Sequence, residues 1–395
     1  MLKSLKVLDF SRLLPGPYAT MMLADLGAEI LKIESPSIPD LIRTEPPFDG
    51  EEAAAHHYLS RSKQSMTLDL KQREAINLVK ELIQDYDVLI EGFRPGVMER
   101  LGLDYETLKE VNPRLIYCSL TSFGQTGPYR DRPGHDNNFL ALSGALHYSR
   151  RQLEPPVTMG IQVGDVAGGS LHTVIGILAA VIHREQTGKG QYVDVSMTDA
   201  TFALNALYGS AYLACDVEPE PERQLLNGGT FYDYYETKDG RFFSVGSLEP
   251  SFRKKLCEAL GLNNQLDLAF SRQPQDEISF KYEVRQAFLK KDFNEWLRIF
   301  ESVEACVEPV LTFSEACHHE QIQARNMIVK VQKQDGSSQK QLAHPIKFSE
   351  FQPLYNQVGK RVGEDTVKVL EKLGYTQQQI EVLQQKGVFG TVSTK

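Results

Sequence analysis

Several features that define whole classes of protein are missing from this chain of 395 residues. Its five cysteines lie far apart and form no Cys-x-x-Cys pair, which argues against a disulfide scaffold and a cysteine-ligated zinc site. The longest nearly apolar run covers residues 174–182, far short of the ~20 residues that span a bilayer. The first residues lack the long apolar stretch of a signal peptide. We therefore expect a cytoplasmic protein without a membrane partner.

An excess of positive charge is also missing. The 43 lysines and arginines are outnumbered by 52 aspartates and glutamates, which gives a net charge of −9. A surface field of this sign disfavours nucleic acid, so we expect no nucleic-acid partner. An anionic small molecule would need a site at which basic side chains are concentrated locally.

The glycine loops that bind phosphates in nucleotide enzymes are missing too. Neither a GxGxxG turn nor a P-loop follows any expected strand, which argues against a nicotinamide dehydrogenase and an ATPase. The adjacent Cys317, His318 and His319 have no partner motif nearby, so we interpret them as ordinary surface residues and expect no metal.

Short apolar runs and amphipathic stretches alternate along the first half of the chain. The expected strands cover residues 5–11, 29–34, 65–70, 87–93, 114–120 and 191–197. The expected helices cover residues 17–26, 72–86, 105–111 and 168–185. Strands separated by helices of this length predict βαβ units and a mainly parallel sheet, and therefore an α/β fold.

The pattern changes after about Asn227. Residues 231–237 and 241–246 are rich in β-formers and are joined by Lys-Asp-Gly at 238–240, which predicts a hairpin. Helical stretches follow at 251–260 and 278–300. This part of the chain predicts a second, smaller α+β domain.

Three residues are candidates for acid–base chemistry. Asp165 directly precedes a long helix in a glycine-rich turn, where helix N–H groups would stabilise a carboxylate or a neighbouring oxyanion. Its glycines, at 164, 168 and 169, would allow a ligand to approach the backbone. His135 lies in the loop after strand 114–120, where parallel sheets place their chemistry, and Asp136 could fix its tautomer. Glu249 follows a strand of the smaller domain and precedes Pro250. Taken one at a time, each residue also fits an ordinary helix start.

A series of ordered motifs runs along nearly the whole chain. They are Val7-Leu-Asp-Phe-Ser11, Pro15-Gly-Pro17, Ala24-Asp-Leu-Gly-Ala28, Lys32-Ile-Glu34, Arg61-Ser-Lys63, Leu68-Asp-Leu-Lys71, Asp87-Val-Leu-Ile-Glu-Gly-Phe-Arg-Pro-Gly96, Phe123-Gly-Gln-Thr-Gly-Pro128, Gly188-Lys-Gly-Gln191 and Gly363-Glu-Asp-Thr366. In these motifs the chain resembles the class III CoA-transferase family, which also contains the α-methylacyl-CoA racemases.

The resemblance implies a Rossmann-like large domain built from both ends of the chain. It also implies an interlocked homodimer. We therefore expect a large domain over residues 1–200, completed by about 345–395. A linker over 201–226, the small domain over 227–330 and a return connection over 331–344 complete this expected layout.

The resemblance also implies roles for the three candidates. In the transferases the residue matching Asp165 is a nucleophile that forms an acyl anhydride. The racemase branch adds Gly-His-Asp before Asn, matched at 134–137, and Glu-Pro, matched at 249–250. Departures from that branch are Ser35 in place of an arginine, a longer connection between residues 33 and 61, and Asn-Gly-Gly-Thr-Phe at 227–231. These departures leave the acyl group open.

The racemase interpretation predicts a 2-methylacyl-CoA epimerase. His135 and Asp165 would exchange the α-proton on opposite faces, and Glu249 would orient His135 and raise its basicity. Backbone N–H groups near Gly168 would stabilise the enolate oxygen. Coenzyme A is expected as part of the substrate, with no other cofactor.

Binding of the CoA phosphates requires local positive charge. The candidate CoA-binding residues are the basic Arg94, Arg100, Lys32, Arg61 and Lys63, together with Asp136. Arg94 ranks first because it follows a strand directly. Two alternatives stay open: a CoA-transferase that moves CoA between carboxylic acids, and a non-catalytic CoA-binding protein.

Overall fold

The computed structural model describes residues 1–390, which divide into two compact units. The larger unit comprises Met1–Ser143, Met159–Leu204 and the residues from Gln323 on. The smaller unit comprises Gly144–Thr158 and Asn205–Ile322. The segment expected as a linker contains helix α10 (Ala206–Cys215), and most of the expected return connection forms the hairpin of β12 (Ile328–Gln332) and β13 (Ser338–Leu342).

A parallel six-stranded sheet forms the centre of the larger unit, as the sequence predicts. Its strands are β1 (Lys6–Asp9), β2 (Glu29–Glu34), β5 (Gln64–Thr67), β6 (Val88–Glu91), β7 (Ile116–Thr121) and β8 (Gln191–Ser196). Their order is β5-β2-β1-β6-β7-β8, and every pairing is parallel. The order reverses between β1 and β6, which is where doubly wound sheets bind ligands at the carboxyl ends of their strands.

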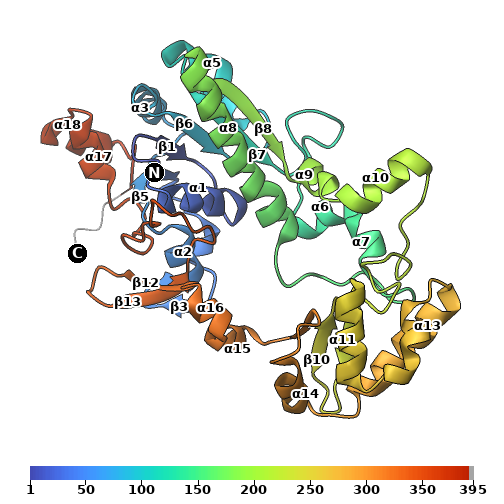
Figure 1. Cartoon of the computed structure of the whole chain (residues 1–395). Coiled ribbons are helices and arrows are strands. Elements are labelled where there is room, and N and C mark those ends of the chain that lie inside the picture. Colours follow the sequence, from blue (N-terminus) through green and yellow to red (C-terminus); the bar gives the residue numbers. More distant parts are fainter. Residues whose placement is uncertain (391–395) are drawn as a thin grey trace. The chain divides into compact units, whose positions relative to one another are not determined.

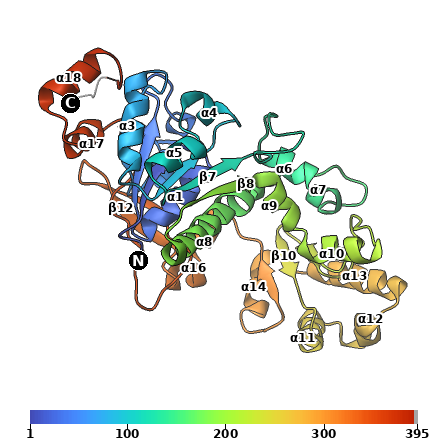
Figure 2. The same ribbon diagram turned by 90° about the horizontal axis from the view of Figure 1, so that it is seen from above.

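Both faces of this sheet are covered by helices, because successive side chains of a strand point to opposite faces. Val7 packs with α1 (Pro15–Asp25) and α8 (His172–Thr187) on one face. Leu8 packs with α3 (Arg73–Ile83), α5 (Tyr105–Val111), α17 (Thr366–Lys372) and α18 (Gln377–Gln385) on the other. Figures 1 and 2 show α8 along β8 and the C-terminal helices beside the sheet. Segments from both halves of the sequence therefore build one core.

The helix that carries Asp165 is longer than the sequence predicts. It begins with a π-helical turn at Gly164–Leu171 and continues as α8 to Thr187. By length and composition its 24 residues could cross a membrane. The sequence did not predict this, because only the shorter apolar run at 174–182 was considered. Core helices meet the same test, and this one packs on α1, β7 and β8. Ile175 and Ile182 nevertheless remain 62% exposed on its outer face.

The smaller unit contains an antiparallel sheet of β9 (Asp233–Glu236), β10 (Phe242–Val245) and β11 (Val307–Pro309). The predicted hairpin turn is present, with Gly240 at a φ of 78°. Its helices include α11 (Pro250–Leu260), α13 (Pro274–Phe288) and α14 (Phe293–Phe300). The single helix expected over 278–300 is two helices, because Asp292 and Glu295 form a capping box that starts α14.

Shorter elements connect these layers. They are η1 (Leu41–Arg43), β3 (Phe48–Asp49), β4 (Glu52–Ala53), α2 (Ala54–Leu59), α4 (Val97–Leu101), α6 (Asp136–Leu142), α7 (Ala145–Tyr148), α9 (Met197–Ala203), η3 (Asn263–Gln265), α12 (Leu266–Phe270), α15 (Phe313–His318) and α16 (Glu320–Ala324).

Candidate active site

His135 is held at the start of helix α6, after the loop that leaves β7. Its backbone N–H donates to Asn138 Oδ1 at 2.9 Å, and its carbonyl accepts from the Asn138 N–H at 2.8 Å. Phe139, which is fully buried, anchors the helix in the core of the larger unit. The backbone of His135 is thus fixed by capping while its side chain stays exposed.

Asp136 connects α6 to the π-helical turn. Its buried carboxylate accepts the backbone N–H of Asp165 at 2.9 Å, across 29 residues of sequence. This contact brings His135 and Asp165 into one electrostatic environment. Burial and the negative charge of Asp136 raise the pKa of Asp165 to about 6, and His135 opposes this shift. Among the described residues, none donates a hydrogen bond to the Asp165 carboxylate, which is half-buried. The group is therefore available to a substrate.

The glycines around Asp165 serve packing, which corrects the expectation that they admit a ligand. An added Cβ would lie 3.0 Å from Asp136 Oδ1 at Gly164, from Thr201 Oγ1 at Gly168 and from Met197 Cγ at Gly169. The absence of side chains at these positions lets the helix approach α6 and α9 closely.

The structure also argues against the expectation that backbone N–H groups near Gly168 stabilise the enolate oxygen. Gly168 lies inside the π-helical turn rather than at the helix start. At the actual start, Asp136 accepts the N–H of Asp165, and the Gln162 carbonyl accepts the N–H of Val166 at 2.9 Å. The N–H groups of Asp165 and Val166 are therefore already used within the protein.

Glu249 belongs to the smaller unit, where it is exposed at the N-cap of α11. Its carbonyl accepts the Arg253 N–H at 2.9 Å, and its charge raises the pKa of Cys306 alongside burial. Its contribution to the chemistry of the larger unit stays a prediction.

Three of the basic residues expected at the CoA phosphates are buried in ion pairs. The pairs are Lys32 with Asp40 at 2.7 Å, Arg61 with Asp25 at 2.5 Å and Lys63 with Asp9 at 3.4 Å. Each of the six side chains is at most 1% exposed. A cation that is already neutralised and out of reach of solvent is a poor phosphate ligand, which argues against that role for all three.

Arg94 and Arg100 are placed differently. Arg94 follows β6 in the loop that leads to α4, and Arg100 lies in the last turn of that helix. Both side chains are exposed, and no hydrogen bond or ion pair of either side chain occurs within residues 1–390. Their charge is available to an anion.

A cavity of about 240 Å³ opens at the carboxyl ends of β1, β2, β5 and β6. It is lined by Phe10, Arg12, Ile33, Glu34, Ser35, Ile38, Asp40, Leu68, Asp69, Leu70, Lys71, Phe93 and Leu101. Arg12, Lys71 and Phe93 each follow the end of a different strand. The sequence did not indicate these three residues, because strand ends were considered only after the expected strands 87–93 and 114–120. The point at which the strand order reverses would have indicated them.

A second cavity of about 290 Å³ lies beside the β12–β13 hairpin. Its lining combines Asp49, Glu51, Glu52 and Asp335 with His57, Lys333 and Arg361, and the last two are paired with Asp49 and Glu51. Within residues 1–390, no three His, Cys, Asp or Glu side chains gather in a way that could hold a metal ion.

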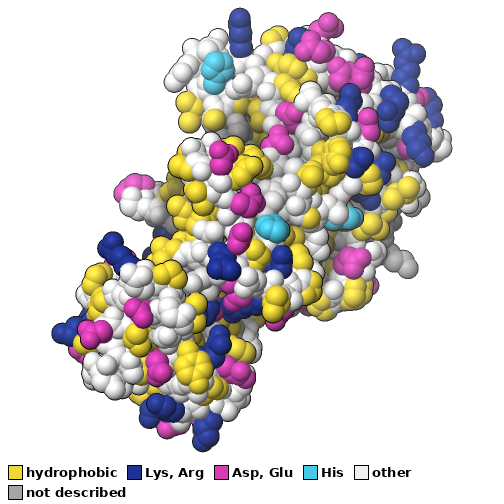
Figure 3. All heavy atoms as spheres, turned by 90° about the vertical axis from the view of Figure 1, so that its right-hand side faces the viewer, with side chains coloured by type: hydrophobic (Ala, Val, Ile, Leu, Met, Phe, Trp, Pro, Cys, Tyr) yellow, Lys and Arg dark blue, Asp and Glu magenta, His cyan; other side chains and the backbone are white. Residues whose placement is uncertain are grey.

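Charged side chains are mixed on the face drawn in Figure 3. Acidic and basic groups alternate there with apolar ones and leave no continuous basic stripe on that face. The strand-end cavity combines Arg12 and Lys71 with Glu34, Asp40 and Asp69 in its lining. Two of these carboxylates are paired with buried cations, Asp40 with Lys32 and Glu34 with Arg43.

Comparison with known proteins identifies relatives over most of the chain. The model of CoA-transferase family III matches residues 2–366. The α-methylacyl-CoA racemase of Homo sapiens is 36% identical over 381 residues, which are 96% of this chain and 95% of that protein. The succinate–glutarate CoA-transferase of Agrobacterium fabrum is 34% identical over 386 residues, 94% of this chain and 95% of that protein. A CAIB/BAIF family protein of Brucella suis has a crystal structure that is 30% identical, with a TM-score of 0.81 over 94% of this chain and 99% of that one.

Racemases and transferases thus occur among its relatives at comparable identity, and both act through acyl-CoA chemistry as their names state. The extent of the family match, the identity to these relatives and the parallel sheet lead to one conclusion: the chain belongs to CoA-transferase family III.

Proposed function

We propose that this protein is an epimerase of 2-methylacyl-CoA thioesters. The observation that carries the proposal is that Asp136 links the helix that begins after His135 to the helix of Asp165, whose carboxylate accepts no hydrogen bond from the described residues. Inversion of a carbon requires one group that removes a proton and another that returns one to the opposite face. An imidazole and a carboxyl group supply these two functions without a further cofactor.

The reaction leaves the thioester intact. Asp165 or His135, depending on the configuration of the substrate, takes the α-proton, and the electron pair of the broken C–H bond delocalises onto the thioester oxygen. The other residue then delivers a proton to the opposite face of the enolate. Glu249, although in the smaller unit, is proposed to orient His135 and raise its basicity, in accord with the Glu-Pro motif of the racemase branch.

The strand-end cavity is proposed to hold the nucleotide portion of CoA. Arg12 and Lys71 offer positive charge at its edge, Phe93 and Ile38 offer apolar surface for a base, and Arg94 stands one residue beyond Phe93. Guanidinium groups pair with phosphates through two parallel hydrogen bonds, which suits Arg12 and Arg94.

A second candidate function is transfer of CoA between carboxylic acids. In that reaction the Asp165 carboxylate attacks the thioester carbonyl and releases CoA thiolate, leaving an acyl anhydride. The accessible carboxylate of Asp165 and the 34% identity to a succinate–glutarate CoA-transferase support it. It assigns no proton-transfer role to His135.

Deuterium exchange separates the two functions. Incubation of (R)- or (S)-2-methylacyl-CoA in D₂O without an acceptor acid should place deuterium at the α-carbon and yield both configurations. A transferase requires the acceptor acid, and its Asp165 intermediate reacts with hydroxylamine. No α-exchange with any branched acyl-CoA, combined with CoA transfer to an added acid, would replace the epimerase proposal by the transferase.

For the substrate configuration whose α-proton faces Asp165, the pH dependence of this exchange should follow the ionisation of Asp165. The pKa of about 6 lies above the ordinary 3.8, so the carboxylate that acts as a base forms only as the pH rises through about 6. We expect kcat/KM to fall about tenfold per pH unit below that value. The measurement is the rate of α-deuteration between pH 4.5 and 8. An acid limb centred near 4 would contradict the raised pKa.

A second copy of the chain is proposed to cover the outer face of α8. Ile175 and Ile182 lie on this face, and their 62% exposure is high for isoleucine on an apolar core helix. The interlocked homodimer implied by the family motifs provides such a cover. Light scattering should give a mass close to twice 44.5 kDa, and a monomer at micromolar concentration would contradict the proposal.

A further inference from the structure

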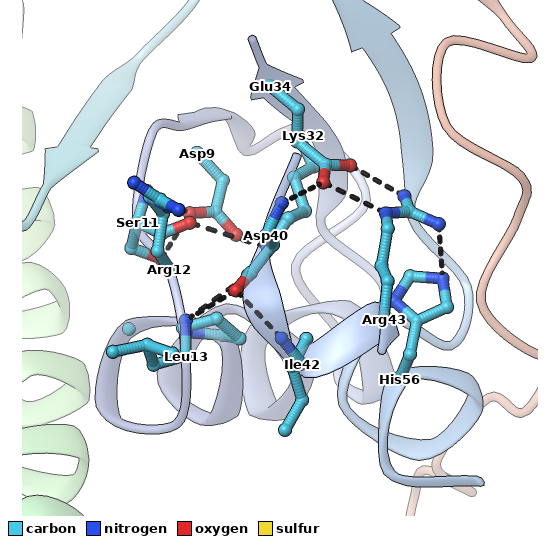
Figure 4. A network of polar contacts seen from close by, with 12 residues as sticks. Asp9, Ser11, Arg12, Leu13, Lys32, Glu34, Asp40, Ile42, Arg43 and His56 are labelled. Atoms are coloured by element: carbon cyan, nitrogen blue, oxygen red, sulfur yellow. Dashed lines mark hydrogen bonds and ion pairs between the residues drawn. The ribbon is translucent and has the colours of Figure 1, made fainter. Parts of the chain in front are cut away.

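The strand-end cavity is walled by two loops that meet through one buried carboxylate. The first loop, residues 10–14, follows β1 and supplies Arg12 to the cavity. The second, residues 35–43, follows β2 and supplies Ser35 and Ile38. Asp40 belongs to the second loop, and its side chain is completely buried. Figure 4 shows this carboxylate between the two loops.

Asp40 bonds to both loops and to the sheet at once. Its Oδ1 and Oδ2 accept the Leu13 N–H at 2.9 and 3.1 Å, and Oδ1 accepts the Ile42 N–H at 3.3 Å. Lys32, which comes from strand β2, donates to Oδ2 at 2.7 Å. Lys32 also donates to the Ser11 carbonyl at 3.3 Å. The lysine that is unsuited to bind phosphate therefore anchors the contact between the loops.

The backbone of Leu13 shows why this contact is needed. Leu13 has a φ of 63°, a left-handed conformation that is costly for a residue with a branched side chain. Its side chain is 39% exposed, so burial alone does not hold it in place. The paired hydrogen bonds from its N–H to Asp40 restrain this turn. The preceding residue, Arg12, also contacts the second loop, because its Nη2 donates to the Pro39 carbonyl at 3.4 Å.

The far end of the second loop is anchored separately. Arg43 donates to both carboxylate oxygens of Glu34, at 2.9 and 2.6 Å, and its Nη1 lies 2.8 Å from His56 Nε2. Burial alone would raise the pKa of Glu34, but Arg43 and Lys32 lower it to about 2, so this anchor stays ionised at neutral pH. Asp40 is thus the link that joins the anchored second loop to the strained turn of the first.

We infer that Asp40 is a positioning residue, which sets the affinity of the protein for CoA by holding Arg12 at the cavity through the turn at Leu13. The inference rests on the proposed placement of CoA. Asp40 itself carries no free charge towards the ligand, because Lys32 neutralises it. Its loss should weaken CoA binding without slowing the proton transfers at His135 and Asp165, which lie on other loops.

The test compares CoA binding and turnover in two variants. Asp40→Asn removes the charge and one of the two acceptors, and we expect the Kd for CoA by calorimetry to rise about tenfold, as for loss of a hydrogen bond to a charged group. KM for the acyl-CoA should rise in step, while kcat at saturation stays within about twofold. Asp40→Glu keeps the charge that pairs with Lys32 but moves the acceptors away from the Leu13 N–H by one methylene, so it should show the same split even if Asp40→Asn folds poorly.

Asp25→Asn is the matched control, because it also removes a completely buried carboxylate from an ion pair, that with Arg61, away from the cavity lining. It should lose thermal stability and keep the wild-type Kd. If the wild-type protein binds no CoA, the proposed function fails. If the wild-type protein binds CoA and both test variants bind it equally well, only the inference about Asp40 fails.

Discussion

Asparagine in place of Asp165 should reduce inversion, and exchange of the α-proton that faces Asp165, by about 10²–10⁴-fold, whereas exchange of the α-proton that faces His135 should fall less. The amide cannot accept the proton, and the carboxylate of Asp165 has no described neighbour of similar kind that is free to replace it, since Asp136 already accepts the Asp165 N–H. CoA transfer should be lost as well, because the same oxygen is the nucleophile in that reaction. The rate of α-deuteration of both substrate configurations measures the first effect, and CoA transfer to an added dicarboxylic acid measures the second.

The stability of the Asp165→Asn variant provides the control. The folded-state pKa of about 6 exceeds the ordinary 3.8, so the folded protein holds this proton more tightly than the unfolded chain does. Wild-type stability therefore falls as the pH rises from about 4 through 6, and the variant lacks this loss. Its melting temperature at pH 8 should equal or exceed that of the wild type. If the folded variant exchanges the α-proton that faces Asp165 at more than a tenth of the wild-type rate, Asp165 is not the base for that proton.

Glutamine in place of His135 should abolish inversion while preserving CoA transfer. The residue is fixed by its backbone contacts with Asn138 and its side chain is exposed, so the fold should tolerate the change. An amide cannot shuttle the proton to one face of the enolate, and inversion should fall by about 10²–10⁴-fold. Exchange of the α-proton that faces Asp165 should fall less. Chiral separation of the products in D₂O measures both rates on one sample.

His183→Gln is the matched control for this variant. His183 is an exposed histidine of the same unit, on helix α8, and no catalytic role is assigned to it. It should retain inversion and transfer at wild-type rates. If the His135→Gln protein inverts its substrate at the wild-type rate, the basis of the epimerase proposal is lost. If the wild-type protein shows no inversion and both proteins transfer CoA, the alternative function is established.

Much of the larger unit was predictable because its strands are short, apolar and separated by amphipathic helices. Buried strands β1, β2 and β6 lie within the expected ranges, and β7 extends one residue beyond its range, to Thr121. The same periodicity did not resolve the gap between α13 and α14, because both helices bury aromatic side chains at compatible spacing and only the cap at Asp292 separates them.

The candidate site was only partly predictable. Motifs indicated His135 and Asp165, and the fold brings them together through Asp136. Motifs also indicated Lys32, Arg61 and Lys63, but a motif does not reveal whether a cation is paired. The carboxylates that neutralise these residues lie 8, 36 and 54 positions away. Such distant pairing depends on the folded sheet, which local pattern cannot supply.

The helices α17 and α18 carry a consequence for biosynthesis. Leu370, Ile380 and Phe389 fill the layer that covers Leu8 and Leu89 of the first-made strands. These residues are translated after all six strands of the sheet. The smaller unit's segment Asn205–Ile322 is translated in between. Apolar surface on the nascent sheet must therefore stay exposed until residues 370–389 have been made, and chaperones can shield it during that period.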